Sequence, residues 1–233
     1  MPYRKLDYAK QYEKYHWIEL DLIKRKSDFR PESYKPADYE DIEIKGKIGT
    51  DGDAWHERRD ICLKKVYHSL DELIGEAKNP KVCTSLATFK PTEILDFTWE
   101  DDGREWDAEK LKEVEAQSRQ GKLFEQETPH LFKVVKKLPC KFKYRFRDVE
   151  GKESNLMIED WEVGALYWKL IDTGESEEGA CKKIRQKFFD DLALTKDLHF
   201  FLGTSLQWHS VGKNPFMIVG VFYPKAITQG RLF

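Results

Sequence analysis

Several features that would identify a common enzyme class are absent from this sequence. It contains no G-x-x-x-x-G-K-[ST] or G-x-G-x-x-G phosphate loop and no G-x-S-x-G nucleophile motif. Among its 233 residues are 4 Cys and 6 His, and none of these are spaced as in a zinc site or a C-x-x-C redox motif. We therefore predict no metal, no cofactor and four reduced thiols. A non-catalytic protein is favoured, although enzymatic activity stays open.

Long apolar runs are missing as well. No stretch of about 18 apolar residues occurs, which excludes a transmembrane helix of ordinary length. The first eight residues, Met-Pro-Tyr-Arg-Lys-Leu-Asp-Tyr, do not resemble the apolar region of a signal peptide. We expect a cytoplasmic protein with no membrane partner.

Aromatic and charged residues are abundant. The chain is 13% aromatic and 35% charged, and it includes 7 Trp, 10 Tyr and 14 Phe. Disordered chains have few such aromatic residues, so we expect a folded protein with a sizeable core. The length allows one or two domains.

The first half of the chain reads as a β-rich subdomain over residues 1–117. Alternating apolar residues predict strands within 16–26, 42–48, 57–67, 81–89 and 92–99. Ser69 and Glu72 form a capping box, which predicts a helix that ends near Lys78. A polar helix is expected over 108–117. Residues 118–130 mix Gly, Gln, Glu and Pro without a period, so we predict a linker there.

The second half, residues 131–233, shows the order β-β-α-α-β-β. Strands are predicted over 141–147, 155–159, 199–208 and 216–223, and Asp160 is a good N-cap for the first of two helices. The last strand is apolar almost throughout, as expected for burial on both faces. We predict an α+β fold in which two helices cover a mostly antiparallel four-stranded sheet.

Several short segments carry a family resemblance. They are Asp28-Phe29-Arg30-Pro31-Glu32-Ser33-Tyr34, Glu159-Asp160-Trp161-Glu162, Leu166-Tyr167-Trp168, Phe200-Phe201-Leu202-Gly203-Thr204, Asn214-Pro215-Phe216 and Gly220-Val221-Phe222-Tyr223-Pro224. With them the chain resembles an uncharacterised family of prokaryotic proteins. The resemblance covers most of the chain and implies the α+β architecture and a prokaryotic origin, but no activity.

The most unusual local pattern is Lys-Phe-Lys-Tyr-Arg-Phe-Arg over residues 141–147. In a strand this alternation places the cations on one face and the aromatic rings on the other. Residues 131–147 include seven basic and no acidic residues, although the whole chain has a net charge of −2. A segregated positive surface is typical of nucleic-acid binding through phosphates. The candidate contacts to DNA or RNA are Lys136, Lys137, Lys141, Lys143, Arg145 and Arg147. The competing interpretation is a solvated strand face whose aromatic residues pack in the core.

Two alternative functions remain open. Glu43-Ile44-Lys45 and the acids Asp96, Glu100, Asp101 and Asp102 include the residue types that hold Mg²⁺ in metal-dependent nucleases. A protein-interaction or assembly subunit is the other alternative, with the tryptophans at an interface. At Trp208-His209, beside a Gly/Asn/Pro turn, a ligand contact is conceivable, but we expect an exposed turn histidine.

Overall fold

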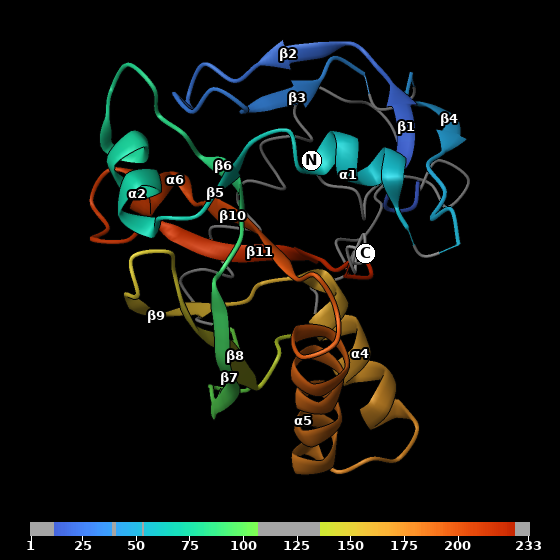
Figure 1. Ribbon diagram of the computed structural model, residues 1–233. Helices are drawn as coiled ribbons and strands as arrows, with labels where there is room; N and C mark the ends of the chain where they lie inside the picture. The colour runs from blue at the N-terminus through green and yellow to red at the C-terminus, as the bar shows by residue number, and fades with distance from the viewer. Residues whose placement is uncertain (1–11, 39–40, 53, 107–135, 227–233) are drawn as a thin grey trace, which may run out of the picture.

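The computed structural model describes residues 12–38, 41–52, 54–106 and 136–226. The elements in chain order are β1 (His16–Glu19), β2 (Leu22–Lys24), β3 (Tyr34–Pro36), β4 (Glu43–Lys47), α1 (His56–Cys62), β5 (Val66–Tyr67), α2 (Leu70–Lys78), β6 (Leu86–Phe89), β7 (Glu93–Asp101), β8 (Cys140–Arg147), β9 (Glu153–Met157), α4 (Trp161–Asp172), α5 (Glu177–Arg185), the π-helix η3 (Gln186–Ala193), β10 (His199–Thr204), α6 (Leu206–His209) and β11 (Phe216–Phe222) (Figure 1). The predicted helix 108–117 and linker 118–130 lie outside the described residues.

The N-terminal part is built from two small antiparallel sheets and one helix. Strand β1 pairs with β4, and β2 pairs with β3. Our prediction of a strand over 57–67 is wrong for most of that range, because residues 56–62 form α1. Trp55 starts this helix with a left-handed φ of 57°, and Arg58 donates to the Ile48 carbonyl oxygen at 2.7 Å. The Asp-Gly turn at 51–52 therefore leads into a helix that packs on the preceding segment.

The larger part of the molecule holds two further sheets in the described residues. One has the order β11-β10-β6-β5 and the other β7-β8-β9. A parallel bridge between Ile158 and Ile218 connects them next to β9 and β11, which extends the arrangement to seven strands. The fold is thus mixed α and β, as predicted at that level. The single four-stranded sheet made of the second half alone is not observed.

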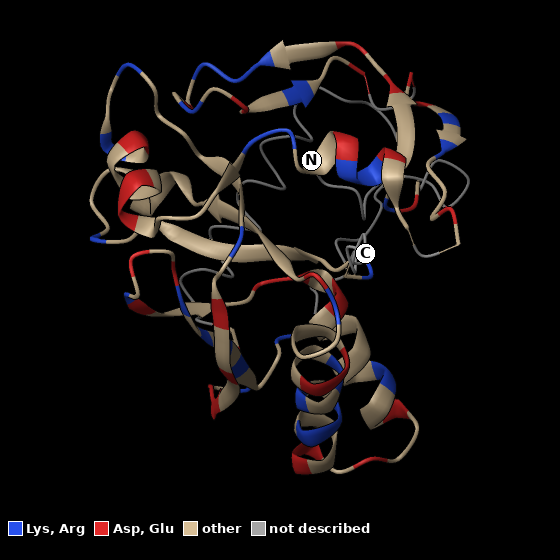
Figure 2. Ribbon diagram, viewed as in Figure 1, with Lys and Arg blue, Asp and Glu red and all other residues tan. Residues whose placement is uncertain are grey.

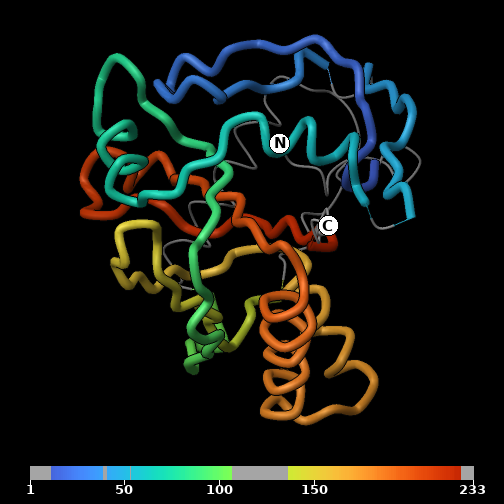
Figure 3. The backbone as a smooth tube through the Cα atoms, in the orientation of Figure 1, coloured from blue at the N-terminus to red at the C-terminus, as the bar shows by residue number. Residues whose placement is uncertain are grey.

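Strand pairing crosses the predicted boundary between the two subdomains. Strand β6 pairs with β10, and β7 pairs with β8 along its length. Tube and ribbon views both show the green strands β6 and β7 leading from the upper part of the molecule into the sheets of the second half (Figures 1 and 3). Residues 1–117 consequently contribute strands to the same sheets as residues 131–233, because β6 and β7 form their hydrogen bonds with β10 and β8.

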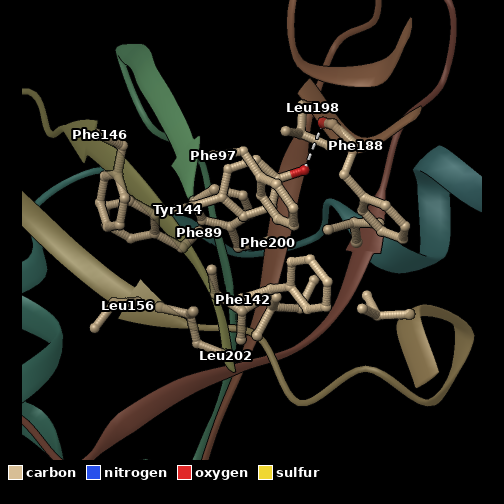
Figure 4. Packing of buried hydrophobic residues seen from close by; sticks show 14 of the residues in the cluster. Phe89, Phe97, Phe142, Tyr144, Phe146, Leu156, Phe188, Leu198, Phe200 and Leu202 are labelled. Carbon is tan, nitrogen blue, oxygen red and sulfur yellow. Dashed lines mark hydrogen bonds between the residues drawn. The ribbon is translucent and has the colours of Figure 1, made fainter. Parts of the chain in front are cut away.

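The core lies where the two larger sheets face each other. Phe200 of β10 packs against Tyr144 and Phe146 of β8, with ring centroids 4.9 and 5.3 Å apart. Phe97 of β7 lies 5.7 Å from Phe188 of η3, in a stacked arrangement. Figure 4 shows these rings interdigitating between strands and helix. Aromatic side chains bury large apolar areas, so this cluster supplies much of the stabilisation.

Local capping explains where the helices begin. The Ser69 hydroxyl oxygen accepts from the backbone N–H of Glu72 at 3.2 Å, which confirms the predicted start of α2. An Asp160 carboxylate oxygen accepts from the N–H of Glu162 at 2.9 Å and caps α4. The Ser176 hydroxyl accepts from Gly179 at 3.0 Å at the start of α5. These three side chains satisfy amide groups that would otherwise lack partners.

Among the described residues, no helix combines the length and the hydrophobicity that crossing a membrane requires.

Candidate functional site

Strand β8 has the two faces that its alternation predicts. Phe142, Tyr144 and Phe146 are buried in the core. Between them the cations emerge on the opposite face, with burial that alternates along the strand. The Tyr144 hydroxyl donates to the Phe188 carbonyl oxygen at 2.7 Å, so even the polar end of this ring is occupied inside the protein. The aromatic residues are therefore part of the core and offer no stacking platform for bases.

Each cation of the strand faces a carboxylate of the protein itself. Strand β7 runs antiparallel to β8 and places acids opposite the basic residues. The ion pairs are Lys141 with Asp102 at 3.1 Å, Lys143 with Glu100 at 2.7 Å, Arg145 with Glu153 at 3.8 Å, and Arg147 with Glu93 at 2.7 Å and Glu153 at 2.6 Å. Red and blue segments lie side by side on these strands in Figure 2. We call this set of pairs the charge ladder.

The two lysines before the strand are also engaged. Lys137 pairs with Asp102 at 3.1 Å and donates to the Gly103 carbonyl oxygen. Lys136 places its ammonium group 3.8 Å from the ring centroid of Trp168, a cation–π contact. Hydrogen bonds from Lys137, and to a smaller extent from Lys141, lower the pKa of Asp102 to about 2. The carboxylate is therefore charged at every physiological pH.

The charge ladder does not form the positive ridge on which the nucleic-acid interpretation depended. Acids and bases alternate across β7, β8 and β9, so their fields largely cancel beyond the distance of a pair. The basic residues of α5 follow the same rule: Lys182 pairs with Glu178 at 2.7 Å, and Arg185 pairs with Asp96 at 3.2 Å. Binding of DNA or RNA by the six predicted residues stays an untested prediction.

The acids proposed for a nuclease do not come together. Glu43 and Lys45 lie on the exposed strand β4, where Lys45 bonds Glu43 and also pairs with Glu19 at 3.2 Å. Asp96 and Asp102 serve α5 and the charge ladder instead. Within the described residues no group of three or more Asp, Glu, His or Cys side chains is arranged to hold a metal ion.

A groove lies over the outer face of the β11-β10-β6-β5 sheet. It has a volume of about 620 Å³ and a mainly apolar floor that includes Leu86 of β6, Phe201 of β10 and Val219 of β11. Ile61 of α1 forms one wall, and Glu32, from the loop between β2 and β3, contributes to the rim. Pockets of 300–1,000 Å³ with apolar linings are typical of binding sites.

One glycine shapes this floor. Gly203 lies in β10, where a Cβ atom would be only 3.0 Å from Val219 Cγ1 and 3.4 Å from Leu86 Cδ2. Because the glycine has no side chain, residues from β6 and β11 approach each other across β10. Leu86 and Val219 are nevertheless 55% and 41% exposed. The expectation that β11 is buried on both faces is therefore wrong at Val219, which faces the groove.

The β2–β3 hairpin is the second exposed apolar feature. Leu22 and Ile23 are neighbours and point to opposite faces, yet they are 55% and 47% exposed. Both faces of the hairpin are thus open to solvent, whereas an isolated two-stranded hairpin is only marginally stable in water. Figures 1 and 3 show the hairpin arching along the outside of the molecule, on the opposite side from α5.

The loop of this hairpin is fixed to the body of the molecule. The Arg30 guanidinium pairs with Asp28 at 2.6 Å and donates to the Thr204 carbonyl oxygen. The Phe29 ring lies 5.3 Å from the His209 ring in an edge-to-face arrangement. Hydrogen bonds from Arg30 hold the pKa of Asp28 far below its ordinary value. Burial alone would raise this pKa, but its effect is smaller. The loop segment and the 200–204 segment, which both carried the resemblance, are in contact here.

His209 differs from our expectation of an exposed turn residue. Its ring is buried, and its Nδ1 lies 2.8 Å from the Thr204 hydroxyl. Trp208 beside it is exposed instead. Phe29 and His209 also line a smaller pocket of about 440 Å³. Sequence reasoning did not find either pocket, because both combine segments that are far apart in the chain. In the sequence, the one feature that pointed toward the groove was the continuous apolar run at 216–222, because it predicted that both faces of β11 make contacts.

Two families of unknown function match consecutive parts of the chain. Residues 1–64 match the family described as Domain of unknown function (DUF8758), and residues 66–233 match the Domain of unknown function (DUF8757). No curated protein and no solved structure matches the chain.

Proposed function

Because the chain belongs to the DUF8757 family, whose function is unknown, we propose a function from its geometry: it is a protein-interaction subunit that binds a partner protein through the groove floor. The observation that carries this proposal is the open apolar face of the central sheet, at Leu86 and Val219. An exposed contiguous apolar surface costs stability in water, so it commonly marks an interaction site.

The chemistry of the groove favours an apolar polypeptide segment over a polyanion. The nearest cation, Lys65, already pairs with Glu76 at 3.3 Å and lies 4.5 Å from the Tyr67 ring centroid. Glu32 on the rim accepts from the Ser85 hydroxyl and adds negative charge. A phosphate backbone would therefore meet no free positive charge among the described groove residues.

The geometry of the hairpin adds to this argument. It borders the groove through Glu32 in its loop, and its strands expose Leu22, Ile23 and Tyr34. A partner that enters the groove would also cover apolar groups of the hairpin. Central apolar anchors inside a polar rim are the usual anatomy of a protein–protein interface.

The test compares the same valine substitution at two exposed positions. Val219→Asp puts a charge on the groove floor, whereas Val149→Asp changes a valine in the turn after β8 that is more exposed still, 62% against 41%. The tagged full chain is purified from cells of its source, and the mass of the complex is measured by light scattering after gel filtration. We expect the wild type and Val149→Asp to retain a stoichiometric protein partner or a second copy. Val219→Asp should elute at the monomer mass of 27.6 kDa.

Two results would contradict the proposal. One is equal partner content in both valine variants, which would place any interface elsewhere. The other is recovery of nucleic acid that declines with salt and when Lys141, Lys143 and Arg145 are changed to Ser, since counterion release would then identify phosphate contacts. Circular dichroism of each variant distinguishes loss of binding from loss of folding.

A further inference from the structure

Two cysteines that are distant in sequence meet inside the C-terminal part of the molecule. Cys140 is the first residue of β8, and Cys181 lies near the middle of α5. Their sulfur atoms are 3.5 Å apart, and both side chains are buried. A strand and a helix hold the pair in place, so the contact does not depend on a loop.

The two sulfur atoms are in contact but are not bonded, at 3.5 Å. A disulfide needs about 2.05 Å between sulfur atoms, so a combined shift of about 1.5 Å is sufficient. The other two cysteines have different neighbours: the Cys83 sulfur lies 3.5 Å from the Pro80 carbonyl oxygen, and Cys62 is half-buried at the end of α1.

The two thiols are also electrically unequal. A hydrogen bond from Cys140 lowers the pKa of Cys181, while the same bond and burial raise the pKa of Cys140. Cys181 is therefore the thiol that ionises first, and Cys140 keeps its proton. This is the division of roles found between an attacking and a resolving cysteine, because the thiolate is the nucleophile.

A third polar group lies in the same region. The Tyr167 hydroxyl of α4 is buried and has no hydrogen-bond partner in the described residues. Burial raises the pKa of Tyr167 to about 12, with smaller contributions from Glu177 and from both thiols. The hydroxyl thus remains protonated and can donate a hydrogen bond.

We propose that Cys140 and Cys181 form a redox modification site, at which a peroxide converts the dithiol to a reversible disulfide. The Cys181 thiolate attacks one oxygen of hydrogen peroxide, and the O–O bond breaks to give a sulfenic acid at Cys181 and hydroxide. Hydroxide takes the proton of the Cys140 thiol and leaves as water. The Cys140 thiolate then attacks the Cys181 sulfur, so that an S–S bond forms and the S–O bond breaks. The second hydroxide takes up the proton that Cys181 gave up when it ionised, and leaves as the second water. Peroxide is reduced by two electrons, which the two sulfurs supply.

The disulfide would tie α5 to the first residue of β8. In the reduced protein the ion pair between Arg185 and Asp96 joins α5 to β7, the neighbour of β8, and apolar packing adds to this contact. Reduction by a dithiol restores the two thiols, because no oxidation beyond the disulfide has occurred. The site is independent of the groove, since none of its residues line it.

The experiment uses the reduced full chain, hydrogen peroxide in slight excess, and alkylation with iodoacetamide after unfolding. Intact mass and peptide mapping then count the free thiols. We expect a species that has lost two hydrogen atoms and two alkylation sites, with one cross-linked peptide pair containing Cys140 and Cys181. Dithiothreitol should reverse it. Cys181→Ser should abolish the cross-link, and Cys83→Ser should leave it intact.

Other outcomes would overturn the proposal. Complete alkylation of both cysteines after peroxide treatment would show that the pair does not react. A cross-link that involves Cys62 or Cys83 would place the reaction elsewhere, and sulfinic acid at Cys181 without a cross-link would show that Cys140 does not resolve it. Peptide mapping of the wild type decides between these outcomes even if a serine variant fails to fold.

Discussion

Phe97 offers a quantitative test of how the β7-β8-β9 sheet and η3 are held together. Its ring is fully buried on β7 and contacts three other rings. The ring centroids lie 4.6 Å from Tyr144, 5.6 Å from Phe142 and 5.7 Å from Phe188. Replacing Phe97 by Ala removes all three ring contacts and leaves a cavity between a strand pair and the π-helix.

The expected loss is about 4 kcal/mol of unfolding free energy, because Phe→Ala changes in cores cost about 3–5 kcal/mol. Phe97→Leu keeps most of the apolar volume and loses mainly the ring contacts. Aromatic pairs contribute about 0.5–1.5 kcal/mol each beyond burial, and a volume-conserving exchange keeps part of that contact, so a loss of about 1–2 kcal/mol is expected. Val149→Ala at an exposed turn should change stability by less than about 0.5 kcal/mol.

Urea denaturation followed by tryptophan fluorescence measures these differences. With a slope of about 2–3 kcal/mol per molar urea, Phe97→Ala should lower the transition midpoint by about 1.3–2 M. The melting temperature should fall by about 8–16 °C. A loss below about 1 kcal/mol, or equal losses for Phe97→Ala and Val149→Ala, would refute the assigned position of Phe97 between the β7-β8 strand pair and η3.

Three further results are expected from the same assay. Ser69→Ala should cost about 1 kcal/mol because it removes the cap of α2, and Ser69→Asn, which keeps an acceptor and adds no charge beside Glu150, should restore most of it. A double-mutant cycle on Lys143 and Glu100 should give a coupling of about 0.2–1 kcal/mol that shrinks in high salt, and a value near zero at low salt would contradict their pairing. Burial lowers the pKa of His199 below its ordinary 6.5, so the unfolded chain takes up a proton before the folded protein does. Stability should therefore fall as the pH drops below about 6.5, and this fall should be smaller in His199→Gln; identical pH profiles would show that His199 does not titrate differently on folding.

The face of each residue in β8 was predictable from sequence, whereas its pairing with β7 was not. Alternation determines that Phe142 and Tyr144 share one side, because the side-chain period of a strand is two. It does not determine which strand supplies the next hydrogen bonds. One of its two antiparallel partners is β9, which follows it in the chain, and the other is β7, from the other side of the expected linker. A signal did exist, since the acids at 100 and 102 have the same two-residue spacing as the lysines at 141 and 143.

The helix caps, by contrast, were predictable, because a few neighbouring residues determine where a helix begins. Ser69 and Asp160 were recognised as N-caps because the capping interaction spans only two or three residues. The groove could not be found in this way, since Glu32, Leu86 and Val219 come together only in the folded molecule. The burial of His209 could not be predicted either, because the ring that covers it belongs to Phe29, which is far away in the chain.

The pairing of early strands with late ones also affects how the chain is made. A ribosome synthesises β6 and β7 well before β8 and β10, so one edge of β7 stays unpaired until residues 140–147 emerge, and one edge of β6 until residues 199–204 emerge. Contacts between residues this far apart slow folding, and unpaired edges invite aggregation in the meantime. A nascent chain stalled near residue 130 would accordingly need a chaperone more than the finished protein does.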